Sequence, residues 1–133
     1  MILVDSSVLI DVIESKPIWS GWSAQQLFEC SQREPLAINI VIYAEISRAF
    51  LNTHSLDIFL KNAAIDVADI PNQAGFSAAR AHDAYRAAGG TRSATLPDFF
   101  IGAHASATGY ELLTRDPKRV RTYFPDIRLI THE

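Results

Sequence analysis

Short apolar runs alternate with longer segments of mixed character along this chain. Apolar runs of strand length recur at five places, residues 1–4, 36–39, 66–70, 111–114 and 128–131. The segments between them carry apolar residues at helical spacing. Strands that alternate with helices form parallel sheets, so the pattern predicts an α/β fold. We expect a single domain over residues 1–133, with a parallel β-sheet flanked by helices on both faces.

The turn and capping residues place the helices and the ends of the sheet. Helices are expected at residues 6–14, 18–33, 40–51, 56–64, 71–88, 97–109 and 117–123. Ser6 or Ser7 is the expected N-cap of the first. Residues 66–70 alternate in character, which indicates an edge strand. Residues 89–95, with Arg92 near the middle, are small and polar and predict a mobile loop.

Carboxylates stand where several of these elements begin or end. Asp5 follows the first strand, Asp116 lies just beyond the fourth, and Asp98 opens the helix that starts at Pro97. In an open α/β sheet, ligands bind in the crevice outside the carboxyl ends of the strands. We therefore expect these acids at one edge of the sheet, with Glu45 as a fourth candidate from the helix over residues 40–51.

Each acid also has a purely structural interpretation. Asp98 stands three residues after Thr95, as in a capping box, and Asp116 precedes Pro117 as a natural N-cap. Glu45 lies at the border of its helix's apolar stripe; it faces either inward or outward to pair with Arg48 three residues on. The sequence alone leaves both interpretations open for each residue.

Other polar and aromatic residues favour structural roles. Asp11 is expected to be a solvated helix residue, since it lies well beyond the tip of the first strand. Trp19 and Trp22 are expected either in the core or on a partner-binding surface. The four histidines are scattered and are interpreted as surface or core residues rather than ligands.

Composition narrows the class of protein. The hydrophobic share of 48% and the charged share of 20% are those of a soluble globular domain. No apolar run is long enough to span a membrane, and the apolar start is cut by Asp5 with no basic region before it, so a cytoplasmic protein is expected. Cys30 is the only cysteine, which excludes an intrachain disulfide and a thiolate metal cluster and suggests a core residue.

Charge and acid clustering together suggest chemistry on phosphates. The net charge of −3 argues against coating nucleic acid by bulk electrostatics, but Arg115, Lys118, Arg119 and Arg121 fall within one short segment. Clustered carboxylates repel one another, and a hard divalent cation such as Mg²⁺ or Mn²⁺ relieves this repulsion. Ser7 and Thr114 are placed to orient a bound water or the carboxylates. Arginine forks beside the metal would hold a phosphate backbone.

Several stretches of the chain resemble the PIN domain family. They are the opening residues 2–10, the helical Glu45, residues 96–105 (LPDFFIGAHA) and residues 113–116 (LTRD). The length and the Tyr-Phe-Pro at residues 123–125 resemble in particular the VapC toxins of type II toxin-antitoxin systems. The resemblance implies a PIN-like fold with Asp5, Glu45, Asp98 and Asp116 as the acidic metal-binding set and Thr114 as a supporting hydroxyl.

The same resemblance implies an activity and partners. The activity would be a Mg²⁺- or Mn²⁺-dependent endoribonuclease that hydrolyses RNA through metal-activated water, with Arg115, Lys118 and Arg119 on the substrate. The partners would be a VapB-type antitoxin and a second copy in a homodimer. The helix opened by Pro97 carries no second acid after Asp98, which leaves the number of metal ions open.

Parts of the sequence also suggest two other functions. A phosphatase of the haloacid dehalogenase type would need a second acid two residues after Asp5, where Ser7 stands instead. A catalytically silent protein-binding module would use the acids only as caps and the tryptophans as a partner surface. Metal titration separates this silent module from the nuclease.

Overall fold

The computed structural model describes residues 1–91 and 94–132; Arg92 and Ser93, in the loop predicted to be mobile, and Glu133 lie outside it. Within these residues five strands form one parallel sheet in the order β3-β2-β1-β4-β5. The strands are β1 (Ile2–Val4), β2 (Leu36–Ile38), β3 (Ile65–Val67), β4 (Glu111–Leu113) and β5 (Leu129–Ile130). The α/β prediction is confirmed.

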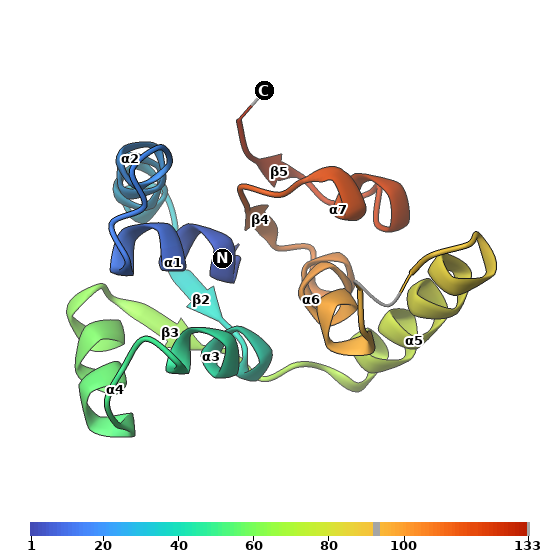
Figure 1. Cartoon of the computed structure of the whole chain (residues 1–133), viewed down its shortest axis with the longest axis horizontal. Helices are drawn as coiled ribbons and strands as arrows, with labels where there is room; N and C mark the ends of the chain where they lie inside the picture. Colours follow the sequence, from blue (N-terminus) through green and yellow to red (C-terminus); the bar gives the residue numbers. More distant parts are fainter. Residues whose placement is uncertain (92–93, 133) are drawn as a thin grey trace.

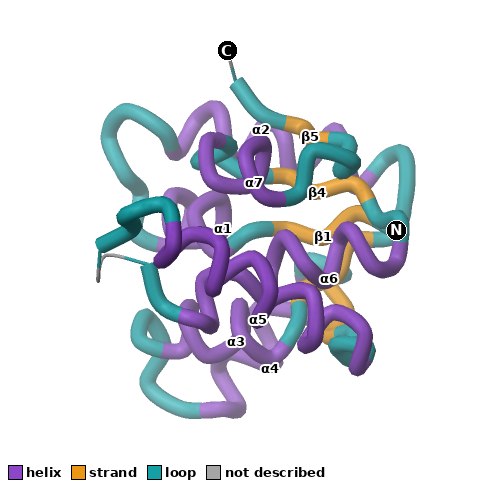
Figure 2. Tube along the Cα trace, turned by 90° about the vertical axis from the view of Figure 1, so that its right-hand side faces the viewer, coloured by secondary structure: helices purple, strands orange, loops and turns teal. Residues whose placement is uncertain are grey.

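Helices lie on both sides of this sheet, as expected. They are α1 (Ser6–Ile13), α2 (Ser20–Ser31), α3 (Ile40–Ser47), α4 (Thr53–Asn62), α5 (Asn72–Ala87), the 3₁₀ turn η1 (Leu96–Phe99), α6 (Phe100–Thr108) and α7 (Lys118–Tyr123). Figure 1 shows α1 and α2 on one side of the sheet and α5 and α6 on the other. Figure 2, turned so that the second side faces the viewer, shows α5 and α6 in front of the strands. No helix in the described part of the chain is long and apolar enough to cross a bilayer.

The strand order reverses between β1 and β4. From β1 the chain adds β2 and then β3 on one side, and later adds β4 and β5 on the other. Val4 at the end of β1 is in register with Leu113 at the end of β4. Such a reversal opens a crevice at the carboxyl ends of the two strands. The residues that follow β1 and β4 therefore meet there.

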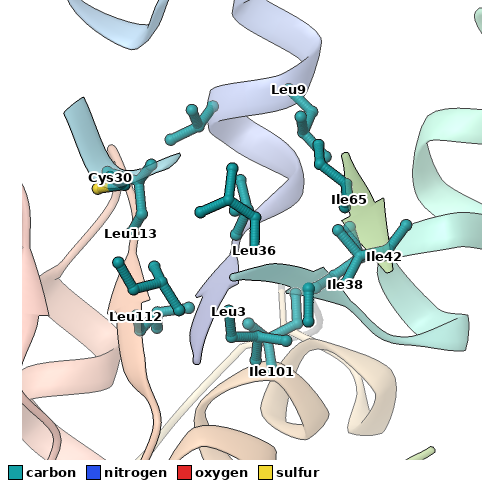
Figure 3. Packing of buried hydrophobic residues seen from close by; sticks show 14 of the residues in the cluster. Leu3, Leu9, Cys30, Leu36, Ile38, Ile42, Ile65, Ile101, Leu112 and Leu113 are labelled. Atoms are coloured by element: carbon teal, nitrogen blue, oxygen red, sulfur yellow. The ribbon is translucent and has the colours of Figure 1, made fainter. Parts of the chain in front are cut away.

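The core explains why β1 and β2 are apolar without alternation. Both strands are buried on both faces, as expected in a parallel sheet covered by helices. Figure 3 shows side chains of the main cluster, including Leu3, Ile38 and Leu112, with the thiol of Cys30 among them. Cys30 is therefore a core residue, as predicted. At β3 only Ile65 is buried while Asp66 and Val67 are exposed, which confirms an edge strand.

A second, smaller cluster lies between α5 and α6. It is built mainly from small side chains of α5, such as Ala74 and Ala78, against Phe99 and Phe124. Gly102 on α6 permits the closest approach, because a Cβ there would meet the Phe124 ring at 2.5 Å. The close neighbour of Gly102 is therefore this ring.

Two predicted helix caps are wrong. The N-cap of α1 is Asp5, and its carboxylate makes no capping bond because it accepts hydrogen bonds from other side chains. The N-cap of α7 is Pro117 rather than Asp116, and the carbonyl of Pro117 accepts from the Arg121 amide. The capping that the sequence assigned to Asp116 is therefore absent, and its carboxylate has no role in starting α7.

Candidate functional site

A cleft of about 350 Å³ lies at the carboxyl ends of β1 and β4. All four predicted acids line it, although they come from four different parts of the chain. The lining also contains hydroxyl groups, apolar side chains from α1 and α6, and two arginines: in full, Asp5, Ser6, Ser7, Ile10, Glu45, Asp98, Ile101, Gly102, Leu112, Arg115, Asp116, Arg119 and Val120.

Asp5 is held by hydroxyl groups from both sides of the strand reversal. Its Oδ2 accepts from Ser7 Oγ at 2.8 Å and from Thr114 Oγ1 at 2.7 Å. Thr114, buried at the end of β4, also accepts from the Asp116 amide at 3.0 Å. Burial raises the pKa of Asp5 above its ordinary value; the hydrogen bonds from Thr114 and Ser7 lower it, and the nearby Asp116 charge raises it further. The two predicted hydroxyls thus orient a carboxylate that is costly to ionise.

Glu45 faces inward from α3. This helix is started by Asn39, whose side chain accepts from the Ile42 amide at 3.0 Å. Glu45 Oε1 is buried and has no hydrogen-bond partner among the described residues. Burial raises the pKa of Glu45; the charges of Asp5 and Asp98 raise it further, and Ser6 and Arg48 lower it.

The inward interpretation of Glu45 is the one the structure supports. No ion pair joins it to Arg48 within the described chain. A buried carboxylate oxygen without a donor is costly, so it marks a place where a ligand or cation would be accommodated.

Asp98 both caps a helix and lines the cleft. Its Oδ2 accepts from the backbone amide and from the Oγ1 of Thr95, in the predicted capping box at the start of η1. The box fixes the orientation of the carboxylate. Asp98 also contributes its charge to the raised pKa of Glu45, so the two interpretations of this residue hold together.

Asp116 is the most open of the four acids, with 69% of its side chain exposed. Its Oδ1 lies 3.5 Å from Nη1 of Arg115. The position of the Arg115 guanidinium is fixed by a buried acid on α1, because its Nε donates to Asp11 Oδ2 at 2.7 Å. Its guanidinium also lies 5.5 Å from the ring centroid of Trp19.

The prediction that Asp11 is solvated is wrong. Its side chain has no exposed surface, and its Oδ2 accepts from Ser23 Oγ at 2.9 Å as well as from Arg115. The physical reason is helical spacing, because Asp11 comes three residues after the buried Val8 and shares its inward face. That spacing is the signal that could have revealed it.

The two tryptophans pack within the chain. Trp22 packs against the main core cluster. Trp19 contacts His132 at 4.4 Å between ring centroids and Trp22 at 6.0 Å. Sequence reasoning gave no sign that His132, near the end of the chain, would meet Trp19, since no local pattern connects them.

The other predicted phosphate-binding residues lie on α7. Arg119 lines the cleft and its guanidinium lies 5.9 Å from the Tyr85 ring centroid and 5.6 Å from that of Phe99. Lys118 begins the helix and is exposed, outside the cleft itself. The basic segment therefore flanks the acids on one side.

The donor set fits a hard divalent cation in its chemistry. The cleft offers carboxylate and hydroxyl oxygens, one of them the buried, unpartnered Glu45 Oε1. Cys30 and His104 are core residues, and His104 contacts Asn39 at 3.1 Å. Across residues 1–91 and 94–132, however, no three acid, histidine or cysteine side chains stand close enough together to form a ready-made metal site.

A cleft at the reversal point of a parallel sheet is the usual place for a ligand site in an open α/β domain. The sequence matches the PIN domain family over residues 2–125, so this chain belongs to the PIN domain family. No curated protein sequence matches it significantly.

Solved structures share the fold over the whole length. A chain of the Rickettsia felis VapBC2 complex bound to a promoter DNA fragment is 18% identical, with a TM-score of 0.74 and full coverage of both chains. VapBC-1 from nontypeable Haemophilus influenzae is 15% identical, with a TM-score of 0.73 and 98% of each chain covered. Mycobacterium tuberculosis VapC20, described as a toxin that cleaves the sarcin-ricin loop, is 13% identical, with a TM-score of 0.67 and coverage of 96% and 99%.

Proposed function

We propose that this protein is a VapC-type toxin that hydrolyses RNA phosphodiester bonds with a divalent metal ion. Asp5, Glu45, Asp98 and Asp116 would hold Mg²⁺ or Mn²⁺. The observation that carries the proposal is Glu45 Oε1, a buried carboxylate oxygen without a donor, in the same cleft as three further acids. When bound, such an ion supplies a water of lowered pKa and neutralises charge on a phosphate.

The chain's own residues have distinct parts in this proposal. Ser7 and Thr114 hold the Asp5 carboxylate in one orientation, and the Thr95 amide does the same for Asp98. Arg115 and Arg119, which line the cleft, would bind the phosphate backbone. Asp11 positions Arg115 by accepting a hydrogen bond from its Nε.

The comparisons support the class of reaction and the partners. Several of the similar solved structures are toxin-antitoxin complexes, and one similar protein is described as an RNA-cleaving toxin. By analogy we propose a VapB-type antitoxin as the protein partner, a homodimeric assembly and RNA as the substrate. The analogy rests on the shared fold and on the acids of this chain's own cleft.

The test is cleavage of total cellular RNA in the presence of Mn²⁺, with new RNA ends mapped for the wild type and for Asp98→Asn. A matched control is Asp83→Asn, which makes the same chemical change at an exposed position on α5 outside the cleft. We expect discrete cuts with the wild type and the control, and none with Asp98→Asn or with chelator. Equal cutting by a folded Asp98→Asn protein would refute the assignment.

One observation favours a second candidate, the catalytically silent binding module. The acids do not form a ready-made metal site within the described residues, and Asp98 already serves as a cap. A Mn²⁺ titration followed by calorimetry decides between the two. Binding that is lost in both Asp5→Asn and Asp98→Asn supports the nuclease, and no binding by the wild type supports the silent module.

A further inference from the structure

A second cavity adjoins the acid-lined cleft. Its volume is about 740 Å³, within the range of small-ligand pockets. It lies between the start of α2, the far end of α5, α7 and the last residues of the chain. Arg115, Asp116 and Arg119 line both cavities, so these three side chains lie where the two cavities adjoin.

Aromatic rings form much of the wall of this second cavity. They fall into two pairs, Trp19 with His132 at 4.4 Å and Tyr85 with Tyr123 at 6.1 Å between ring centroids. All four rings are partly exposed. An arginine guanidinium lies over one ring of each pair. Arg115 is 5.5 Å from the centroid of the Trp19 ring, and Arg119 is 5.9 Å from that of the Tyr85 ring.

Trp19 differs from the other rings in its lack of a core role. Tyr85 and Tyr123 both pack on the buried Phe99 and thereby support the second core cluster. Trp22 packs on the main cluster, whereas Trp19 belongs to neither. Its ring instead contacts His132, Trp22 and Arg115, is partly exposed and lines the cavity, so a stacked base would add to an existing group of rings and guanidinium.

We propose that this cavity binds a nucleobase of the RNA, next to the phosphodiester held at the acids. Single-stranded RNA is recognised by stacking unpaired bases on aromatic rings and arginine planes. Arg115 and Arg119, which lie over these rings, also line the acid cleft. They would therefore hold the phosphate that joins the bound base to the reacting bond. Lys118 adds a third cation at the cavity wall. This inference rests on the proposed function and gives its substrate a single-stranded site.

The test compares two chains that differ only in their bases. One is a single-stranded RNA of eight nucleotides, and the other has the same length and charge but carries abasic residues throughout. Binding of each is measured in chelator, so that no cleavage intervenes. We expect the wild type to prefer the chain with bases, and Trp19→Ala to reduce this preference about 5- to 150-fold, the range for removal of one stacked base. Affinity for the abasic chain should not change.

Two variants serve as controls. Trp19→Phe keeps a ring and should keep most of the preference, which separates stacking from loss of folding. Phe76→Ala removes an aromatic ring that also carries an arginine, Arg80 at 4.7 Å, but is exposed on α5 outside both cavities. It should bind both chains as the wild type does.

The outcomes separate this inference from the proposed function. If the wild type cleaves RNA but Trp19→Ala keeps the full preference for bases, the base site is wrong and the nuclease stands. If the preference depends on Trp19 but no RNA is cleaved, the base site stands on a silent protein. Equal binding of both chains by the wild type overturns the base site, as does a Trp19→Ala protein that binds RNA normally but no longer holds a co-expressed VapB-type antitoxin.

Discussion

Arg115 Nε lies 2.7 Å from Oδ2 of the fully buried Asp11, although the two residues are 104 positions apart in the chain. The contact ties α1 to the loop that follows β4. Ser23 donates to the same carboxylate oxygen, so α2 is joined to the same point. A buried acid beneath a rim arginine fixes where that arginine presents its remaining donors.

Asp11→Asn should therefore destabilise the protein by about 1–3 kcal/mol, because a hydrogen bond between charged groups is replaced by a weaker one beside a partly buried cation. Equilibrium unfolding in urea measures the change. Glu14→Gln, which breaks the exposed pair with Lys16 on the same stretch, should cost less than about 1 kcal/mol. Equal costs for the two variants would show that the Asp11 pair contributes no more than a surface ion pair.

Asp5→Asn should stabilise the metal-free protein at neutral pH by about 0.5–2 kcal/mol, the usual gain when a costly functional group is relieved. Burial raises the pKa of Asp5 in the folded state. From its unfolded pKa of about 4 upward, the folded state then holds more protons than the unfolded state. Stability due to this group is thus complete at low pH and is lost as pH rises through the folded pKa.

The difference in unfolding free energy between wild type and Asp5→Asn, measured in chelator across this pH range, tests the sign. It should be near zero in acid and grow toward neutral pH in favour of the variant. Added Mg²⁺ should stabilise the wild type and leave Asp5→Asn unchanged. A wild type that becomes relatively more stable as pH rises would contradict the raised pKa.

Gly102→Ala should destabilise the protein by about 1–3 kcal/mol, because its new methyl group would meet two ring atoms of the buried Phe124 at 2.5 and 2.9 Å. Gly21→Ala is the matched substitution in α2, where nothing lies within 4 Å of the new atom. It should stabilise by about 0.5–1 kcal/mol through helix propensity alone. Thermal unfolding of the two variants should move in opposite directions.

Lys118→Ala should weaken RNA binding and reduce the slope of log affinity against log salt by about 1, since one phosphate contact and its released counterion are lost. Titrations at several salt concentrations give the slope. Lys61→Ala, on α4 and outside both cavities, removes the same charge and should leave the slope unchanged. Identical slopes for Lys118→Ala and the wild type would place the RNA elsewhere.

The features that sequence reasoning predicted well depend on local patterns. The apolar run before Asp5, the border position of Glu45 and the capping box at Asp98 each involve a few neighbouring residues. The rule that parallel strands present their carboxyl ends at one edge then brings these residues to one cleft. The family resemblance added the function that this cleft was expected to perform.

What the sequence did not reveal depends on contacts between distant segments. The Asp11–Arg115 pair and the Trp19–His132 contact join positions far apart, and neither has a spacing signal. Asp116 is not the cap of α7 because the helix begins later than predicted, at Lys118 with Pro117 as its N-cap. The distances between the four acids likewise depend on how the helices and strands pack together, and the order of these residues in the sequence does not reveal them.

The pairing of β1 with β4 also sets the moment at which the cleft can exist. The hydrogen bond from Thr114 to Asp5 closes a loop of 109 residues, and Asp116 lies beyond it. A growing polypeptide that has reached Gly109 contains Asp5, Glu45 and Asp98. It still lacks β4, which pairs with β1, and the fourth acid, Asp116. Because such long-range strand pairing forms late, a partly synthesised chain cannot assemble the site. A ribosome making this protein would thus not be exposed to a finished cleft until the chain had been synthesised and released beyond Asp116.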